Sequence, residues 1–216
     1  MSKIIFVTFL TIFTSIPLFL RYLCMKKYER LKAKLREQED ESYYECIFFG
    51  PTNFSCRPHL IGKQDCGDYC SYTYLQRLIH YLNSAKSSIS MCMYTLTLNQ
   101  IAAILVTASQ RGVRVRLITD KTMSKSTVSK DIFGGLKKNG NCVEIKMPKS
   151  SEQLMHHKYC LIDEKDKLSA KMFFGSANAT TQAFCKNFES MILTNNWDMI
   201  EKLSEEYEEL WNMFDN

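Results

Sequence analysis

The sequence predicts an α/β domain in which helices flank a mixed β-sheet. Two segments with apolar residues at helical spacing, 74–84 and 99–110, alternate with the short apolar segments 88–94 and 113–119. In the second half of the chain several strand-like segments succeed one another before an amphipathic segment at 197–214. Helices alternating with strands, and then consecutive strands, are typical of an α/β sandwich with a mixed sheet.

Each element is predicted from its residue pattern. Leu75, Leu78 and Leu82 lie three and four residues apart, as on one face of a helix. Gly112 can end the helix over 99–110. The other elements expected, in order, are the strand 88–94, the strand 113–119, the helix 127–138 ended by Asn139-Gly140, the strands 142–147, 155–163, 172–175 and 189–194, and the helix 197–214.

One strand-like segment concentrates side chains with chemical function. It reads HHKYCLID and places His156, Lys158 and Asp163 in an H-x-K-x4-D pattern. In an extended strand His156 and Lys158 face one side, whereas His157 faces the other. A His-x-Lys pair by itself is usually an ordinary surface pair, so its meaning depends on the residues near it in the chain.

The sequence GSAN, a short distance further along the chain, adds a hydroxyl at Ser176 and a carboxamide at Asn178. A neutral imidazole is a nucleophile, while an ammonium and an amide can hold the oxygens of a phosphoryl group. The complete set therefore favours attack on a phosphodiester, and it does so without requiring a metal.

These motifs resemble the HKD signature of the phospholipase D superfamily, and in particular its single-motif branch of bacterial endonucleases and mitochondrial Zucchini-like proteins. The likeness covers about 72–216 and includes RGVRVRLITD, MHHK, GSAN and the N-x-E of Asn187 and Glu189. It implies a phospholipase D-like mixed β-sheet flanked by helices. In one departure, residues 164–174 form a longer segment before G-S than the family usually has. A longer hairpin loop would explain it.

The resemblance also implies a role for each motif residue. His156 would be the nucleophile that forms a phosphohistidine, and Lys158 with Asn178 would bind the non-bridging oxygens. Ser176 would hold the phosphate or orient an imidazole. Glu189 would accept a hydrogen bond from the far nitrogen of His156 and so fix its tautomer.

Asp163, although part of the motif, is expected to be structural at the end of its strand. A group of lysines is a candidate basic rim for an anionic substrate, with Lys121, Lys125 and Asn187 taken as substrate-binding residues. Simple solvation of these lysines is an equally open interpretation. The lysines of the rim are Lys121, Lys125, Lys130, Lys137, Lys138 and Lys149.

The chain holds a single H-x-K, because neither His59 nor His80 has a lysine two residues later. Larger members of the superfamily carry two HKD motifs, and one histidine cannot both attack phosphorus and protonate the leaving oxygen. We therefore expect a homodimer in which the acid is His156 of a second copy. No cofactor is expected for catalysis.

The N-terminus begins with an uncharged, mostly apolar segment, 4–20, which contains Pro17 and precedes a cluster of lysines and arginines. It predicts a single-pass membrane anchor over 1–24, a charged linker over 25–45 and a catalytic domain over 46–216. A cleaved signal peptide is the rival interpretation, but the positive charge lies on the wrong side for it. With the resemblance, this favours the mitochondrial outer membrane with the catalytic domain in the cytosol.

A separate segment, 56–70, is rich in metal-binding side chains and in turn residues. Four of its residues could close a structural zinc site, although the spacing fits no common finger and reduced cysteines in a loop are the alternative. The zinc-binding insert known in the resembled branch favours zinc. The expected ligands are Cys56, His59, Cys66 and Cys70, with Cys46 as a substitute.

Composition sets broader limits on function. The 216 residues suffice for one α/β domain with an appendage, and nine cysteines without a secretory context indicate reduced thiols or metal ligands. The net charge of +5 favours an anionic partner without choosing among RNA, DNA and acidic lipid.

The resemblance leaves three functions open. The first, which we favour, is a single-strand endoribonuclease in piRNA maturation that works with proteins of that pathway. The second is a cardiolipin hydrolase that produces phosphatidic acid at the same membrane. The third is a non-catalytic membrane scaffold for piRNA factors, which would not need the intact motif.

Overall fold

The computed structural model describes residues 16–33, 43–50, 70–140, 143–150, 152 and 154–214. The chain divides into two compact units, Met1–Ser42 and Tyr43–Asn216. In the first unit, residues 16–33 form a helix with exposed side chains. Within the described ranges no helix combines the length and apolarity needed to cross a bilayer. Most of the expected anchor, residues 1–15, lies outside those ranges.

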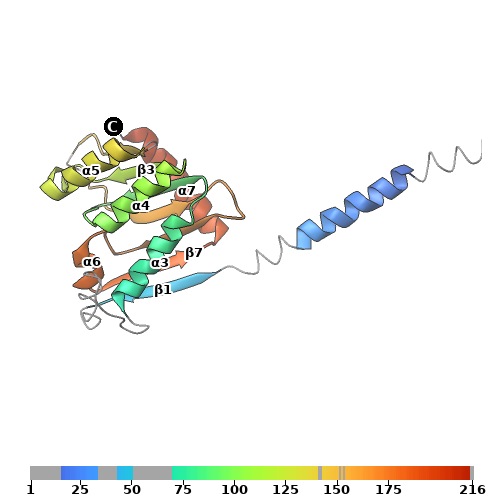
Figure 1. The fold of residues 1–216 in the computed structure, drawn as a ribbon, viewed down its shortest axis with the longest axis horizontal. Helices are drawn as coiled ribbons and strands as arrows, with labels where there is room; N and C mark the ends of the chain where they lie inside the picture. Colours follow the sequence, from blue (N-terminus) through green and yellow to red (C-terminus); the bar gives the residue numbers. More distant parts are fainter. Residues whose placement is uncertain are drawn as a thin grey trace, which may run out of the picture. The chain divides into compact units, whose positions relative to one another are not determined.

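The described residues of the second unit form a mixed sheet of seven strands in the order β1-β7-β6-β5-β2-β3-β4 (Figure 1). β2 and β3 pair in parallel, as do β3 and β4, whereas the other neighbours are antiparallel. The mixed sheet expected from the sequence is therefore confirmed. The strands are β1 (Tyr44–Phe49), β2 (Ser88–Met93), β3 (Arg114–Thr119), β4 (Val143–Lys146), β5 (Lys158–Ile162), β6 (Lys171–Gly175) and β7 (Glu189–Thr194).

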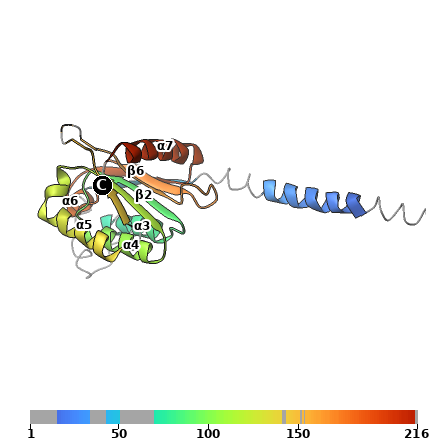
Figure 2. The same ribbon diagram turned by 90° about the horizontal axis from the view of Figure 1, so that it is seen from above.

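Helices cover both faces of this sheet. In Figure 2, α7 lies on one face and α3, α4 and α5 lie on the other. Because β2 and β3 pair in parallel, the chain must return along one face of the sheet between them. The helix α4 forms that crossover connection. The helices are α3 (Ser71–Asn83), α4 (Asn99–Gln110), α5 (Thr127–Asn139), α6 (Thr181–Cys185) and α7 (Trp197–Met213), with a short 3-10 helix, η2 (Met123–Lys125).

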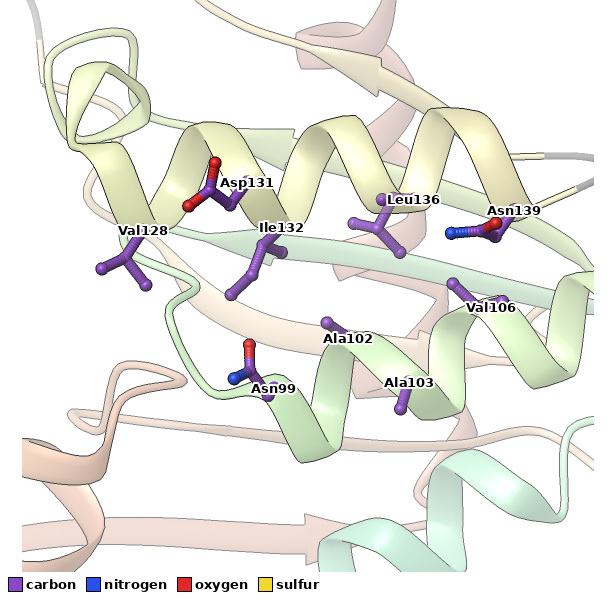
Figure 3. A pocket seen from close by; sticks show the side chains of 10 residues that line it. Asn99, Ala102, Ala103, Val106, Val128, Asp131, Ile132, Leu136 and Asn139 are labelled. Carbon is purple, nitrogen blue, oxygen red and sulfur yellow. The ribbon is translucent and has the colours of Figure 1, made fainter.

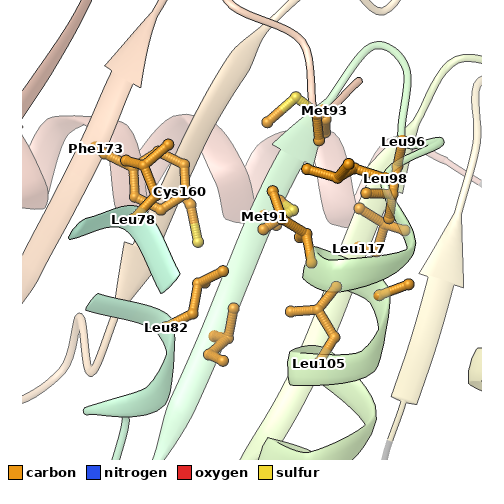
Figure 4. Close-up of a cluster of buried hydrophobic side chains, with 14 of the residues drawn as sticks. Leu78, Leu82, Met91, Met93, Leu96, Leu98, Leu105, Leu117, Cys160 and Phe173 are labelled. Carbon is orange, nitrogen blue, oxygen red and sulfur yellow. The ribbon is translucent and has the colours of Figure 1, made fainter. Parts of the chain in front are cut away.

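Two apolar clusters, one on each face, hold these layers together. Figure 4 shows the larger cluster, where Leu82 of α3 and Leu105 of α4 are directed toward Met91 of β2. The residues of β2 alternate between the faces, so Cys92 belongs instead to the cluster under α7, with Tyr207 among its members. Alternation thus gives each strand two apolar faces and requires helices on both.

A buried charged network fastens α7 to its face of the sheet. Arg116 of β3 is 5% exposed and donates to Glu208 of α7 at 2.7 Å. The same guanidinium lies 3.4 Å from Glu164 and stacks over the ring of Tyr207 at 4.8 Å. Because these partners satisfy the buried cation, Arg116 serves the fold and is not free to bind substrate.

The sequence predicted the boundaries of α4 and β7 as the structure has them. Two differences matter. β1 was not anticipated, and it begins at Tyr44, inside the segment that the sequence assigned to the linker. β5 begins at Lys158 and not at residue 155, so His156 and His157 lie just before the strand. The carbonyl of His157 nevertheless accepts from the amide of Tyr94, which keeps this segment beside β2.

Gly175, at the end of β6, permits a close approach between β6 and β7. A Cβ atom at this position would collide with the backbone carbonyl of Ser190 and would lie 2.8 Å from the Cα of Met191. Any larger residue must therefore push β7 away from β6. Gly134, within α5, is the opposite case, because a Cβ there would meet nothing within 4 Å.

We expect Gly175→Ala to lower the free energy of unfolding by about 1–3 kcal/mol, as forced overpacking does. The matched control, Gly134→Ala, should raise it by roughly 0.5–1 kcal/mol, because alanine favours the helix. Urea unfolding of the three proteins measures both effects. Equal stability of Gly175→Ala and the parent would show that the two strands do not approach as closely as described.

Candidate active site

Five predicted site residues lie at one edge of the sheet, which we call the catalytic edge. There the ends of β2 and β6 lie beside the starts of β5 and β7. Met93, at the end of β2, pairs with Lys158, at the start of β5. Gly175, at the end of β6, pairs with Met191 near the start of β7. This pairing brings the segments that carry His156, Lys158, Ser176, Asn178 and Glu189 to a common edge, although the sequence spreads them over some thirty positions.

His156 and Lys158 are in direct contact. The Nζ of Lys158 lies 3.3 Å from each imidazole nitrogen of His156 and donates to the carbonyl of that residue at 2.8 Å. Burial lowers the pKa of the Lys158 ammonium below its ordinary value, and the Glu189 carboxylate opposes that shift. A partly desolvated cation beside a nucleophilic ring suits a phosphoryl group, since its attraction for an anion is less screened by water.

Tyr94 packs on this pair, and sequence reasoning missed it. Its ring centroid lies 4.7 Å from that of His156, and the Nζ of Lys158 lies 5.2 Å from the Tyr94 centroid. The tyrosine therefore restrains both groups and limits the orientations of the imidazole. The available signal was its place directly after the buried strand that pairs with the motif strand.

On the neighbouring strands, Ser176, Asn187 and Glu189 form a hydrogen-bonded group. The Ser176 hydroxyl donates to one oxygen of Glu189 at 2.5 Å, and the Asn187 amide donates to the other at 2.9 Å. Both oxygens of Glu189 are thus engaged, and no hydrogen bond joins Glu189 to His156 within the described part of the chain. The carboxylate orients Ser176 here, which differs from the contact with His156 that the resemblance implied.

Asn178 lies on the segment between β6 and α6, which the parallel bridge between Leu96 and Ala179 holds beside the end of β2. The Oδ1 atom of Asn178 is buried and accepts no hydrogen bond from the described residues. Its Nδ2 group likewise makes no hydrogen bond to the described residues, so this NH2 group is available to donate to a ligand oxygen.

Asp163 lies at the far end of β5, roughly 16 Å from Lys158 along the strand. Its buried carboxylate accepts from the backbone amides of residues 86–88 at 2.7–3.1 Å. Burial by itself raises the pKa of this carboxyl, but these hydrogen bonds outweigh it and hold the pKa below its ordinary value. Asp163 thus ties the start of β2 to the end of β5, as a structural residue would.

A second structural carboxylate, at Asp120, was not anticipated. It is fully buried at the end of β3, and its Oδ2 accepts from the amide of Met155 at 3.3 Å. Its Oδ1 accepts from the amides of Thr122 and Met123 at 2.8 and 3.0 Å. Asp120 therefore positions the residue just before His156.

Other predicted residues stand apart from this group. His157 faces away, with its Nε2 3.5 Å from Glu206 of α7, in agreement with strand alternation. Lys121 donates to the carbonyl of Lys149, and Lys125 is exposed at the end of η2. Nothing in the described contacts ties either lysine to His156, so their substrate-binding role stays a prediction.

The expected zinc ligands cannot be placed as a set. Cys70 is buried just before α3, whereas Cys56, His59 and Cys66 lie in the segment 51–69, outside the described residues. Cys46 lies on β1 with an exposed side chain. Among the residues that are described, no group of three or more histidine, cysteine or acidic side chains could hold a metal. Zinc binding therefore stays a prediction.

A pocket of about 460 Å³ between α4 and α5 does not belong to this site (Figure 3). Figure 3 shows Ala102 and Val106 of α4 facing Ile132 and Leu136 of α5, with few polar groups between them. None of the predicted site residues lines it. Chemistry needs convergent polar groups, and these are found instead at the edge that carries His156.

The chain is similar to several known proteins. A family model described as "Cardiolipin synthase, PLD-like domain" matches residues 78–211. A protein named mitochondrial cardiolipin hydrolase from Mus musculus is 30% identical, over 79% of this chain and 76% of the relative. One of the same name from Xenopus laevis is 30% identical, over 93% of this chain and 85% of the relative. The Salmonella typhimurium phospholipase D family member Nuc shares the fold, with a TM-score of 0.61 and 22% identity over 81% and 97% of the two chains.

The structural role of Asp163 predicts that the loss of stability caused by Asp163→Asn depends on pH. Asparagine tolerates the left-handed backbone of this position, φ 54°, so the substitution isolates the charge. Because the folded pKa is depressed, the carboxylate contributes its full stability above the ordinary aspartate pKa of about 3.9. That contribution is lost as the pH falls through the lower folded pKa.

At pH 7 the variant should therefore be less stable by at least about 1.5 kcal/mol, since hydrogen bonds to a charged acceptor are lost. The difference should shrink below about pH 4. Denaturant unfolding between pH 2.5 and 7 measures it, with Asp131→Asn on the exposed face of α5 as control. A difference in stability that stays constant across this pH range would show that the backbone amides of residues 86–88 do not stabilise a charged Asp163 carboxylate.

Proposed function

The chain belongs to the phospholipase D superfamily, and on this premise we propose that it is a phosphodiesterase that works through a phosphohistidine at His156. The observation that carries the proposal is the contact between the His156 ring and the Lys158 ammonium at 3.3 Å, at the edge that also holds Asn178 and Glu189. A nucleophile, a cation and amide donors are thereby available around one phosphoryl group.

In the proposed first step an imidazole nitrogen of His156 attacks phosphorus while the bond to the leaving oxygen breaks. Lys158 and the Asn178 amide stabilise the charge that develops on the non-bridging oxygens. Tyr94 keeps the imidazole in place, because its ring packs at 4.7 Å. Ser176, held by Glu189, is placed to donate to a phosphate oxygen when substrate replaces that contact.

The leaving oxygen needs a proton, and we propose that His156 of a second copy supplies it. The second HKD motif of larger superfamily members has no counterpart in this sequence. In the second step the deprotonated ring of that copy takes a proton from water, which attacks phosphorus and releases the first His156. The reaction thus returns both rings to their starting states and uses no metal.

Single-stranded RNA is the substrate we propose. The catalytic edge is polar and carries a partly buried ammonium, which favours a phosphodiester flanked by polar groups. Cleavage would leave a 5′-phosphate and a 3′-hydroxyl, as required for a role in piRNA maturation with proteins of that pathway. The names of the curated relatives, mitochondrial cardiolipin hydrolase, support a mitochondrial protein and make cardiolipin the second candidate substrate.

An N-terminal anchor in the mitochondrial outer membrane, with the catalytic unit in the cytosol, completes the proposal. It rests on the apolar segment 4–20 and the basic cluster next to it. A scaffold without catalysis is disfavoured, because a scaffold would not need the contact between His156 and Lys158. A side-by-side assay of the full-length protein on single-stranded RNA and on cardiolipin vesicles, with EDTA present, decides between the two substrates.

His156→Asn should lower turnover of the preferred substrate by about 10³-fold or more, because the nucleophile is removed. His157→Asn is the matched control. It should keep activity within about twofold, since that ring faces Glu206 on α7 and takes no part in the chemistry. Steady-state rates of both variants check this expectation, and equal losses in the two would contradict the assignment.

The two-copy scheme predicts how mixed subunits behave. When His156→Asn chains are exchanged with an equal amount of parent chains, random pairing leaves about half of the parent chains with an inactive partner. Activity per parent chain should therefore fall to about half. An activity per parent chain that stays constant at every mixing ratio would show that each chain acts as an independent monomer.

A further inference from the structure

Beside the catalytic edge lies an open pocket of about 370 Å³ that the proposed mechanism does not use. All of its lining residues are polar and uncharged. We call it the threonine pocket, after the four hydroxyl side chains among them. It is lined by Thr95, Thr97, Asn178, Thr180, Thr181, Gln182 and Asn187.

The polar lining results from one local pairing. Leu96 and Ala179 form a parallel bridge, and both are fully buried. In extended chain the neighbours of a residue point to the opposite side, so the side chains before and after Leu96 share a face with those before and after Ala179. The sequences T-L-T and N-A-T therefore place three hydroxyls and an amide on one surface.

This surface adjoins the site through two shared residues. Asn178 lines the pocket and is a proposed phosphate ligand, while Asn187 lines it and donates to Glu189 at 2.9 Å. A ligand whose phosphoryl group lies at His156 therefore has its neighbouring group within reach of the pocket. The pocket is thus suited to the part of a phosphodiester that flanks the scissile bond.

The lining chemistry narrows what that part can be. Hydroxyls and carboxamides both donate and accept hydrogen bonds, which complements a ligand that carries hydroxyl groups. A second phosphate would be better served by cations, and an acyl chain would need apolar walls. The ribose of RNA fits, because its 2′-hydroxyl is both donor and acceptor and is the group that distinguishes RNA from DNA.

We propose that the threonine pocket binds the ribose next to the scissile phosphate and thereby makes the enzyme prefer RNA over single-stranded DNA. This inference rests on the proposed phosphodiesterase function and adds a source of specificity to it. The hydroxyls of Thr95 and Thr97 are the determinants, and neither belongs to the groups that act on phosphorus.

The test uses the full-length protein and the near-isosteric variants Thr95→Val and Thr97→Val, which keep the branched shape and the backbone pairing. Substrates are a single-stranded RNA, the DNA of the same sequence, and bis(p-nitrophenyl) phosphate, which has no sugar. Each variant should lower kcat/KM for RNA by about 2- to 12-fold, the range for one lost hydrogen bond. Its kcat/KM for DNA and for the sugar-free diester should match the parent.

Two controls separate the pocket from effects on folding. Thr107→Val changes an exposed threonine of α4 that does not line the pocket and should leave all three substrates unaffected. Gln182→Leu, an exposed pocket residue of α6, provides a second probe of the ribose if either threonine variant unfolds. It should reduce RNA cleavage selectively.

Each other outcome has a distinct meaning. A parent protein that cleaves neither the three diesters nor cardiolipin vesicles would overturn the proposed function itself. Cleavage with an RNA-to-DNA ratio that the pocket variants leave unchanged would overturn the ribose subsite and leave the function standing. Selective loss of cardiolipin hydrolysis in these variants would overturn the ribose subsite. It would show instead that the pocket binds the central glycerol hydroxyl of cardiolipin.

Discussion

The antiparallel pairing of β5 between β2 and β6 is the constraint on which the site depends. Its register sets Lys158 opposite Met93 and Tyr159 opposite Phe174. A slip of one residue would turn Lys158 to the face that α7 covers and bring Tyr159 to the catalytic side. The register is secured by burial, since every residue of β5 is buried and the alternating side chains feed two separate apolar clusters.

Two buried carboxylates fix the position of segments at the two ends of β5 in addition to the strand pairing. Asp163 ties the far end of β5 to the start of β2, and Asp120 holds the amide of Met155 just before His156. Both charges are buried and met by backbone amides, so each makes one geometry much more favourable than its alternatives. The catalytic edge can then leave Asn178 and Lys158 available for substrate, because the fold is held in place by other groups.

Much of this arrangement could be predicted from the sequence where a local pattern dictates it. The helix α4 and the strand β7 have strong apolar periodicity, and their bounds were predicted as found. β1 escaped prediction because it comes after a charged segment and is stabilised by pairing with β7, which lies far away in the chain. Tertiary pairing of this kind leaves little trace in a short window of sequence.

The same distinction applies to the site. The motif residues could be identified from their spacing in the sequence. The roles of Tyr94 and Asp120 could not, because they depend on contacts across strands. Glu189 shows the limit most clearly, because its two oxygens bind Ser176 and Asn187 where the resemblance implied His156. The threonine pocket likewise arises from two segments that meet at a single bridge between Leu96 and Ala179.

The most direct measurement of the central claim is mass spectrometry of the protein quenched during turnover of a phosphodiester. The account predicts an acid-labile phosphoryl adduct on the peptide that contains His156, which disappears when the substrate is exhausted and is absent in His156→Asn. Continued turnover with no adduct on that peptide, or an adduct on a different residue, would contradict it.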